Sequence, residues 1–198
     1  MANVWDERYS QPGFYYGDTP NDFLREHASR IPPGEVLCLG EGEGRNALYL
    51  AQLGYQVTAV DSSAVGLEKL SKRAEAGGLL IRTVCADLAK YDFGSARWSA
   101  VVSIFCHLPP PLRAFVHARA VSALRPGGLV LLEAYTPRQL QLGTGGPKDQ
   151  SLLYEMRTLA SDFAALRREH LAELEREVIE GIGHTGRASV VQLIGARP

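Results

Sequence analysis

The sequence predicts an α/β fold in which a mostly parallel sheet is covered by helices on both faces. Two observations carry this prediction. Short continuous apolar runs, typical of strands buried on both faces, alternate with amphipathic stretches of helical length along residues 36–135. A glycine-rich turn follows the first of these runs and leads directly into a helical pattern. Strand–helix alternation at this spacing implies right-handed βαβ units and therefore a doubly wound sheet.

The N-terminal segment precedes the first strand. Its first 18 residues show no regular pattern and are rich in aromatic side chains. A helix is expected to follow, with Thr19 as its N-cap and Pro20 at its first helical position. It is expected to end near Arg30, before the breaking run Pro32-Pro33-Gly34.

The central part alternates strands and helices in a regular way. The expected strands are 36–39, 55–60, 79–84, 98–105 and 129–135, and the expected helices between them are 45–53, 64–76 and 110–124. Gly54 and the pair Gly77-Gly78 end the first two of these helices. The run Arg125-Pro126-Gly127-Gly128 is expected as a turn into the fifth strand.

The C-terminal third allows two interpretations. Residues 152–163 are expected as a helix, 181–186 as a turn and 188–196 as a strand. Between them, the charged residues 164–180 favour a helix by local propensity. A final strand at 188–196 nevertheless needs a neighbour, and an antiparallel strand ending near Glu180 would supply it.

Composition limits the class of protein. The 198 residues are expected to form one domain, with three free cysteines, no disulfide framework and no metal site. With 21 basic and 22 acidic residues, the net charge of −1 argues against binding to nucleic acid or to an anionic membrane. No apolar run approaches roughly 18 residues, and the N-terminus is too acidic for a signal peptide. We therefore expect a cytoplasmic protein, monomeric or weakly dimeric.

The glycine-rich turn Gly40-Glu41-Gly42-Glu43-Gly44 is the most informative motif. Glycines at alternate positions allow the backbone to turn sharply and to approach a ligand. The two carboxylates would be unfavourable beside a pyrophosphate but favourable beside a cation. The motif therefore favours S-adenosylmethionine, a sulfonium, over a nicotinamide cofactor, and a tight turn without any ligand is the alternative.

Two acids follow the next two strands. Asp61 ends the second strand, where a carboxylate can accept hydrogen bonds from both hydroxyls of a ribose. Its alternative role is the N-cap of the following helix, which Ser62 or Ser63 could fill instead. Asp87 lies just past the third strand and can meet an adenine amino group, or can simply be a solvated loop acid.

Together these motifs resemble class I S-adenosylmethionine-dependent methyltransferases. The resemblance covers Gly34 to Tyr135 and rests on the glycine turn, Asp61, Cys85-Ala86-Asp87-Leu88, Ser103-Ile104-Phe105-Cys106 and Leu124-Arg125-Pro126-Gly127-Gly128. A narrower resemblance, to small bacterial tellurite-resistance and thiopurine S-methyltransferases, adds Trp5-Asp6-Glu7-Arg8-Tyr9, Tyr16-Gly17, Gly44-Arg45-Asn46, Ser103-Ile104-Phe105-Cys106-His107-Leu108-Pro109 and Thr144-Gly145-Gly146-Pro147-Lys148.

The resemblance implies a Rossmann-like, seven-stranded sheet that ends in an antiparallel hairpin. It divides the domain into an N-terminal lid and helix (1–30), a cofactor-binding core (34–135) and a substrate loop with the hairpin (136–198). The residues it assigns to S-adenosylmethionine are Gly40, Glu41, Gly42, Gly44, Asp61, Ser62, Asp87, Leu88, Ile104 and Phe105, with Trp5 and Tyr16 in the lid. Aromatic faces suit a sulfonium through cation–π attraction.

The chain departs from the family pattern at two points. Cys38 stands in the first strand where the wider family usually carries an acid. Either Glu41 or Glu43 supplies the missing negative charge, or backbone carbonyls bind the methionine amino group. After the fourth strand there is no Asn/Asp-Pro-Pro-Tyr motif, which methylation of nucleic-acid bases commonly uses. Nucleic acid is therefore not expected as a substrate.

The candidate catalytic residues are His107, Arg45 and Lys148. His107 follows the fourth strand, where it could deprotonate an acceptor or simply start a helix. Arg45 and Lys148 could bind an anionic substrate or be solvated charges. The three cysteines lie near strand ends, but buried free cysteines usually behave as small apolar residues, so ligation of a metalloid is the minor alternative and Cys106 alone near the substrate another.

We therefore expect S-adenosylmethionine-dependent methyl transfer to a small soft nucleophile, either a thiol or an oxyanion of tellurium, selenium or arsenic. The alternatives are a small-molecule O- or N-methyltransferase and a protein that binds S-adenosylmethionine without catalysis.

Overall fold

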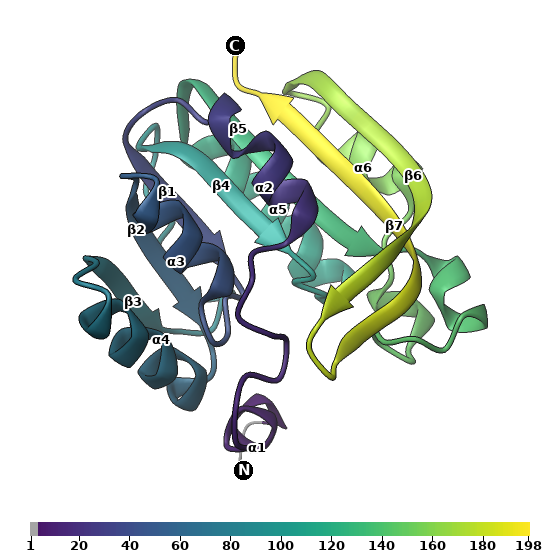
Figure 1. The fold of residues 1–198 in the computed structure, drawn as a ribbon. Helices are drawn as coiled ribbons and strands as arrows, with labels where there is room; N and C mark the ends of the chain where they lie inside the picture. Colours follow the sequence, from purple (N-terminus) through teal and green to yellow (C-terminus); the bar gives the residue numbers. More distant parts are fainter. Residues whose placement is uncertain (1–3) are drawn as a thin grey trace.

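The computed structural model describes residues 4–198 and contains a seven-stranded sheet in the order β3-β2-β1-β4-β5-β7-β6 (Figure 1). The strands are β1 (Glu35–Leu39), β2 (Gln56–Asp61), β3 (Ile81–Cys85), β4 (Trp98–Ile104), β5 (Leu124–Tyr135), β6 (Arg167–Glu180) and β7 (His184–Ala196). The first five strands run parallel, and β7 is antiparallel to both β5 and β6. The predicted fold class is confirmed. The predicted N-terminal lid begins with residues 1–3, which lie outside the described part.

Helices cover both faces of this sheet (Figure 1). They are α1 (Val4–Tyr9), α2 (Asp22–His27), α3 (Arg45–Gln52), α4 (Ala64–Ala76), α5 (Pro110–Ala123) and α6 (Met156–Asp162). Side chains alternate along β1, so that Val36 and Cys38 pack with α2, α3 and α4, whereas Leu37 and Leu39 pack with α5 and α6. No helix in residues 4–198 has both the length and the apolar character needed to cross a membrane.

The N-terminal region differs from the sequence expectation at two places. Residues 4–9, expected to be irregular, form the short helix α1, which Asp6 fixes by accepting hydrogen bonds from the Ser63 hydroxyl (2.5 Å) and the Val65 amide (3.4 Å). The N-cap of α2 is Asn21 and not Thr19, because the Asn21 side chain accepts the Leu24 amide at 3.0 Å. Helix α2 ends at residue 27, and a 3₁₀ turn continues to residue 30.

The C-terminal third resolves in favour of the hairpin. Residues 167–180 form β6 and not a helix, since pairing with β7 along the whole strand outweighs the local helix propensity. The expected helix at 152–163 is shortened to α6, and β7 begins at His184 instead of near residue 188. Only residues 190–196 of β7 pair with β5, so the tip of the hairpin extends beyond the end of β5.

The strand order fixes where a ligand can bind. Strands β1 and β4 are neighbours, and the chain continues from them in opposite directions across the sheet. In doubly wound sheets such a switch point leaves a crevice at the carboxyl ends of the strands. The loops after β1 and β4 therefore face the same space.

Candidate active site

A cavity of about 690 Å³ lies at this switch point. Its volume is in the range of small-molecule and cofactor sites. The loops after β1, β2, β3 and β4 line it, together with the N-terminal segment, the loop around residues 143–149 and the tip of the hairpin. Every predicted site residue lines the cavity except Gly42, so the structure brings together residues from position 5 to position 148.

The glycine turn has the conformation that only glycine adopts readily. Gly40, Gly42 and Gly44 have φ values of +59°, +57° and +86°. A Cβ on Gly40 would lie 2.7 Å from the Cys106 sulfur, and one on Gly42 would lie 2.4 Å from the Tyr9 hydroxyl. Gly42 is thus covered by the N-terminal segment, which explains why it does not reach the cavity.

The two carboxylates of the turn have different surroundings. Glu41 accepts the Ala47 amide at 2.7 Å at the start of α3, and desolvation raises its pKa to about 7. Glu43 accepts the Tyr15 amide and the Lys69 ammonium, both at 2.7 Å. Glu43 therefore anchors the N-terminal segment. Among residues 4–198 no cation lies within 4 Å of Glu41, although the more distant Arg45 favours its charged form, so Glu41 is a carboxyl group of the turn without a direct ionic partner.

Asp61 ends β2 with its side chain only 7% exposed. It accepts the Gly42 amide at 2.8 Å and the Ser63 amide at 2.7 Å, and burial raises its pKa. The N-cap of α4 is Ser63, whose hydroxyl oxygen accepts the Gly66 amide at 3.0 Å. Because each carboxylate oxygen has a further lone pair, Asp61 holds the glycine turn and can still accept ligand hydroxyls.

Asp87 and the cysteines complete this side of the cavity. Asp87 is exposed at the rim and accepts the Ala89 amide at 2.9 Å. Cys106 lines the cavity, Cys38 is fully buried and Cys85 is exposed, and all three are free. Burial raises the pKa of Cys106 to about 12, so it is a neutral thiol at pH 7. Within residues 4–198, no group of three or more metal-ligating side chains is arranged around a common point.

His107 lines the cavity, but the backbone occupies both of its ring nitrogens. Nδ1 donates to the Leu152 carbonyl at 2.8 Å, and Nε2 accepts the Tyr135 amide at 3.4 Å. Desolvation lowers its pKa to about 4. The imidazole is therefore neutral and saturated, which fits the expected structural alternative for His107 better than a general base.

Arg45 is committed to a buried ion pair. Its guanidinium lies 2.5 Å from the Glu180 carboxylate on β6 and donates to the Thr19 carbonyl at 3.3 Å. The side chain is only 9% exposed. Arg45 therefore joins the glycine turn to the hairpin and is not a free cation. Lys148 is exposed at the rim, where no carboxylate of residues 4–198 lies within 4 Å of it.

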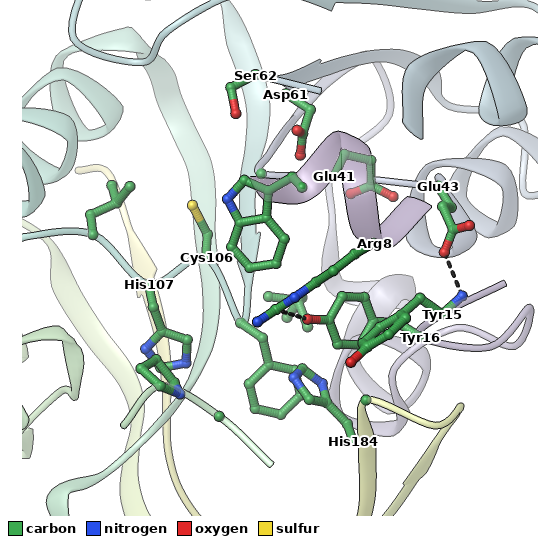
Figure 2. A pocket seen from close by; sticks show the side chains of 18 of the residues that line it. Arg8, Tyr15, Tyr16, Glu41, Glu43, Asp61, Ser62, Cys106, His107 and His184 are labelled. Atoms are coloured by element: carbon green, nitrogen blue, oxygen red, sulfur yellow. Dashed lines mark hydrogen bonds between the residues drawn. The ribbon is translucent and has the colours of Figure 1, made fainter. Parts of the chain in front are cut away.

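The sequence analysis missed His184, which is the first residue of β7 (Figure 2). Its ring contacts Tyr16 and Phe105, with centroids 4.4 and 4.6 Å away, and its Nδ1 lies 3.7 Å from Glu180 Oε2. Burial lowers the pKa of His184, although Glu180 opposes the shift. The sequence predicts a turn at residues 181–186, and no local signal indicates that the hairpin extends beyond β5 and carries His184 to the cavity.

The N-terminal segment closes the cavity with aromatic rings. Trp5, Tyr9 and Tyr16 line it as the lid interpretation requires, and Tyr9 packs between the other two, with ring centroids 6.1 and 6.3 Å away. Arg8 extends from α1 into the same space and donates to the Tyr16 hydroxyl at 3.1 Å (Figure 2). The sequence analysis quoted Arg8 only as part of a motif and assigned it no role.

Comparison with known proteins identifies the central part of the chain. Residues 36–128, which span the glycine turn, Asp61, Asp87 and the loop after β4, match the family model described as a methyltransferase domain. This segment of the chain has the sequence pattern of a methyltransferase domain. The predicted resemblance to class I methyltransferases, and within them to the tellurite-resistance group, is confirmed.

Two curated relatives match part of the chain. The uncharacterized methyltransferase YodH of Bacillus subtilis is 38% identical over 78 residues, which are 39% of this chain and 34% of that protein. The probable S-adenosyl-L-methionine-dependent methyltransferase TehB of Haemophilus influenzae is 40% identical over 72 residues, 33% of this chain and 25% of TehB. The matched part thus spans about a third or less of the length of these relatives.

Solved structures share the fold over nearly the whole chain. The crystal structure of Haemophilus influenzae TehB has a TM-score of 0.75 at 20% identity and covers 98% of this chain and 66% of that one. A second structure, from work on the conversion of a disulfide bond into a thioacetal group during echinomycin biosynthesis, has a TM-score of 0.76 at 21% identity. The match covers 97% of this chain and 87% of that one. At these identities the similarity establishes the fold.

Proposed function

We propose that the protein transfers a methyl group from S-adenosylmethionine to a small soft nucleophile, a thiol or an oxyanion of tellurium, selenium or arsenic. The observation that carries this is the distribution of titratable side chains around the cavity. Four carboxyl groups lie in the part formed after β1, β2 and β3, here called the cofactor half (Glu41, Glu43, Asp61, Asp87), and one more, Asp149, lines the cavity from the loop after β5. Histidines and a lysine lie in the part formed after β4, β5 and β6, here called the acceptor half (His107, Lys148, His184).

The cofactor half fits S-adenosylmethionine. Asp61 has lone pairs free for the ribose hydroxyls, and Asp87 stands at the rim where the adenine amino group is expected. Glu41, a carboxyl group without a cationic partner among the described residues, matches the positively charged methionine end. Trp5 and Tyr16 line the same cavity from the lid side, with Arg8 stacked on the Trp5 ring.

The chain contributes orientation, exclusion of water and one proton acceptor. When bound, the cofactor supplies a methyl carbon that forms a bond to the acceptor as its bond to the sulfonium sulfur breaks, with that electron pair remaining on the sulfur. His184, neutral and held toward Glu180 through Nδ1, accepts the proton of the acceptor on its other nitrogen. The aromatic lid removes the soft nucleophile from water, which favours its attack.

One observation favours a second candidate. A neutral imidazole facing the cavity would also serve an acceptor that must lose its proton during the reaction, such as a phenol or an amine. A thiol, whose pKa is near 8.5, is already partly ionised at neutral pH and depends less on that base.

The test measures binding and turnover separately. Calorimetry with S-adenosylmethionine and with NAD should give binding only for the former. Conversion of the cofactor to S-adenosylhomocysteine is then followed with matched thiols, selenite, tellurite, phenols and amines. Turnover with phenols or amines alone would overturn the soft-nucleophile proposal. Binding without turnover on any acceptor would favour the third expectation, a non-catalytic S-adenosylmethionine-binding protein.

A further inference from the structure

Arg8 stands out among the arginines of the cavity because it has no acidic partner. Its guanidinium carbon lies 4.8 Å from the centre of the Trp5 ring and 5.7 Å from that of Tyr15. Within the described part of the chain it donates one hydrogen bond, to the Tyr16 hydroxyl. Among residues 4–198 no carboxylate lies within 4 Å of it. Of the five N–H donors of this group, most therefore remain available to a ligand.

Several other arginines of the chain, including the second one in the cavity, carry ion pairs. Arg45, the other arginine of the cavity, is bound to Glu180, and surface arginines such as Arg30 and Arg97 are bound to Glu169 and Glu35. Stacking against aromatic rings holds a guanidinium in one orientation without neutralising it. Arg8 is thus a fixed, unneutralised cation that points into a cavity (Figure 2).

Lys148 faces the same cavity from a different element. It belongs to the loop that joins β5 to α6, and it is also without an acidic partner among the described residues. His184, which lies close enough to Arg8 for that charge to oppose its protonation, is between the lid and the hairpin. Arg8 from the lid and Lys148 from the loop after β5 therefore line the same cavity as His184, and Asp149, the acid next to Lys148 in sequence, makes no ion pair with either cation among residues 4–198.

We propose that Arg8 and Lys148 bind an anionic group of the acceptor, so that the methyl acceptor of this site is a small acid. This inference rests on the proposed function and names its substrate class. For an organic thiol the anionic group is a carboxylate separate from the sulfur, and for an inorganic acceptor it is an oxygen of the oxyanion itself. Arg8 contributes the directional contact, since its planar donors match two oxygens, and Lys148 adds charge.

A matched pair of acceptors tests the inference on the full chain. 3-Mercaptopropionate carries the carboxylate, and 3-mercaptopropanamide replaces it with a neutral group of nearly the same shape. The wild type should prefer the acid by about tenfold in kcat/KM, the loss that one charge-assisted hydrogen bond at a partly exposed site represents. The ratio between the two thiols is the readout, because a general effect on the lid changes both rates equally.

Substitutions assign the preference to residues. Arg8→Gln should bring the ratio close to one, Arg8→Lys should retain part of it, and Lys148→Gln should lower it about threefold. Arg119→Gln is the matched control, since Arg119 is exposed on α5 away from the cavity, and it should leave the ratio unchanged. Selenite turnover that depends on Arg8 in the same way would place the anion on the nucleophile itself and would support the same site.

Binding without turnover separates the two proposals. Calorimetry of 3-mercaptopropionate with protein saturated in S-adenosylhomocysteine should show affinity that Arg8→Gln weakens about tenfold, whether or not any thiol is methylated. Equal rates for the acid and the amide, with no effect of Arg8→Gln on their ratio, would overturn the inference and leave methyl transfer intact. Binding of the acid with no turnover of any acceptor would overturn the proposed function and leave the anion site intact.

Discussion

Asp61→Asn is the most informative single substitution, because the structure gives this side chain two separable roles. The wild-type carboxylate, 7% exposed, accepts the amides of Gly42 and Ser63. Asparagine keeps one acceptor oxygen but turns an NH₂ group toward the other amide. One charge-assisted hydrogen bond, worth about 1.5–3 kcal/mol, is lost. Since burial already raises the pKa of Asp61, removing its charge recovers part of this cost. We expect a net destabilisation of about 2 kcal/mol.

This loss should lower the melting temperature by about 4–8 °C, because a domain of this size shifts by roughly 2–4 °C per kcal/mol. Affinity for S-adenosylhomocysteine should fall about 10- to 150-fold, since the ribose hydroxyls lose a charged acceptor. Thermal unfolding measures the first quantity and calorimetry the second, both without turnover. Asp87→Asn is the control. The exposed Asp87 side chain accepts the local Ala89 amide, so the melting temperature of the Asp87→Asn protein should differ from that of the wild type by less than about 2 °C.

The two measurements can contradict the reasoning independently. A lower melting temperature with unchanged affinity would mean that Asp61 only holds the glycine turn, and the assignment to the ribose would be wrong. Weaker binding with an unchanged melting temperature would mean that the hydrogen bonds to Gly42 and Ser63 do not stabilise the fold.

Three further predictions concern charge in and around the cavity. His184→Gln should lower kcat and abolish the rate loss that the wild type shows below about pH 6.5. The reason is that the neutral imidazole is the active form and burial holds its pKa below the usual 6.5. A pH profile that the substitution leaves unchanged would show that His184 takes no part in the reaction. Glu41→Gln should make unfolding less sensitive to pH. The pKa of Glu41 is about 7 in the folded protein and lower in the unfolded chain, so the wild type loses stability as pH rises from about 4.5 through 7. Melting temperatures at pH 5 and pH 8 compare the wild type with the variant. Glu41→Gln should also bind the cationic cofactor more weakly. Glu133→Ala should cost about 3–5 kcal/mol in urea unfolding, because Glu133 is fully buried and bonded to Asn21, Arg176 and Gln192; a loss under 1 kcal/mol would contradict a buried ionic network there.

The strands and the glycine turn were predictable because their signals are local. The buried apolar runs predicted the ends of β1 to β4 to within two residues. The exception is β5, which begins at Leu124 because the predicted turn at 125–128 is part of the strand. Helix α4 has the predicted bounds. The placement of the candidate site residues followed, because the carboxyl ends of parallel strands meet at one edge. What the sequence could not supply was the partner of a charged side chain. Arg45 looked free beside a ligand loop, and the carboxylate that pairs with it comes from Glu180, 135 residues later.

The same limitation explains the errors at both ends of the chain. Helix α1 is only six residues long and depends on contacts of Asp6 with the start of α4, which no local pattern reveals. Strand β6 carries the composition of a helix, and its conformation is decided by pairing with β7. His184 lies in a turn by sequence, and only the extension of the hairpin beyond β5 brings it to the cavity.

The buried network of Asn21, Arg45, Glu133 and Glu180 has a consequence for the order of folding. Its hydrogen bonds join residues separated by 112, 135 and 159 positions. Contacts of such long range form late, because closing each loop costs chain entropy before the contact is gained. Until β6 and β7 add to the sheet, Arg45 lacks its carboxylate and Asn21 lacks one of its two acceptors, Glu180. The parallel core can therefore collapse early, while a rigid cofactor turn emerges only in the final step of folding.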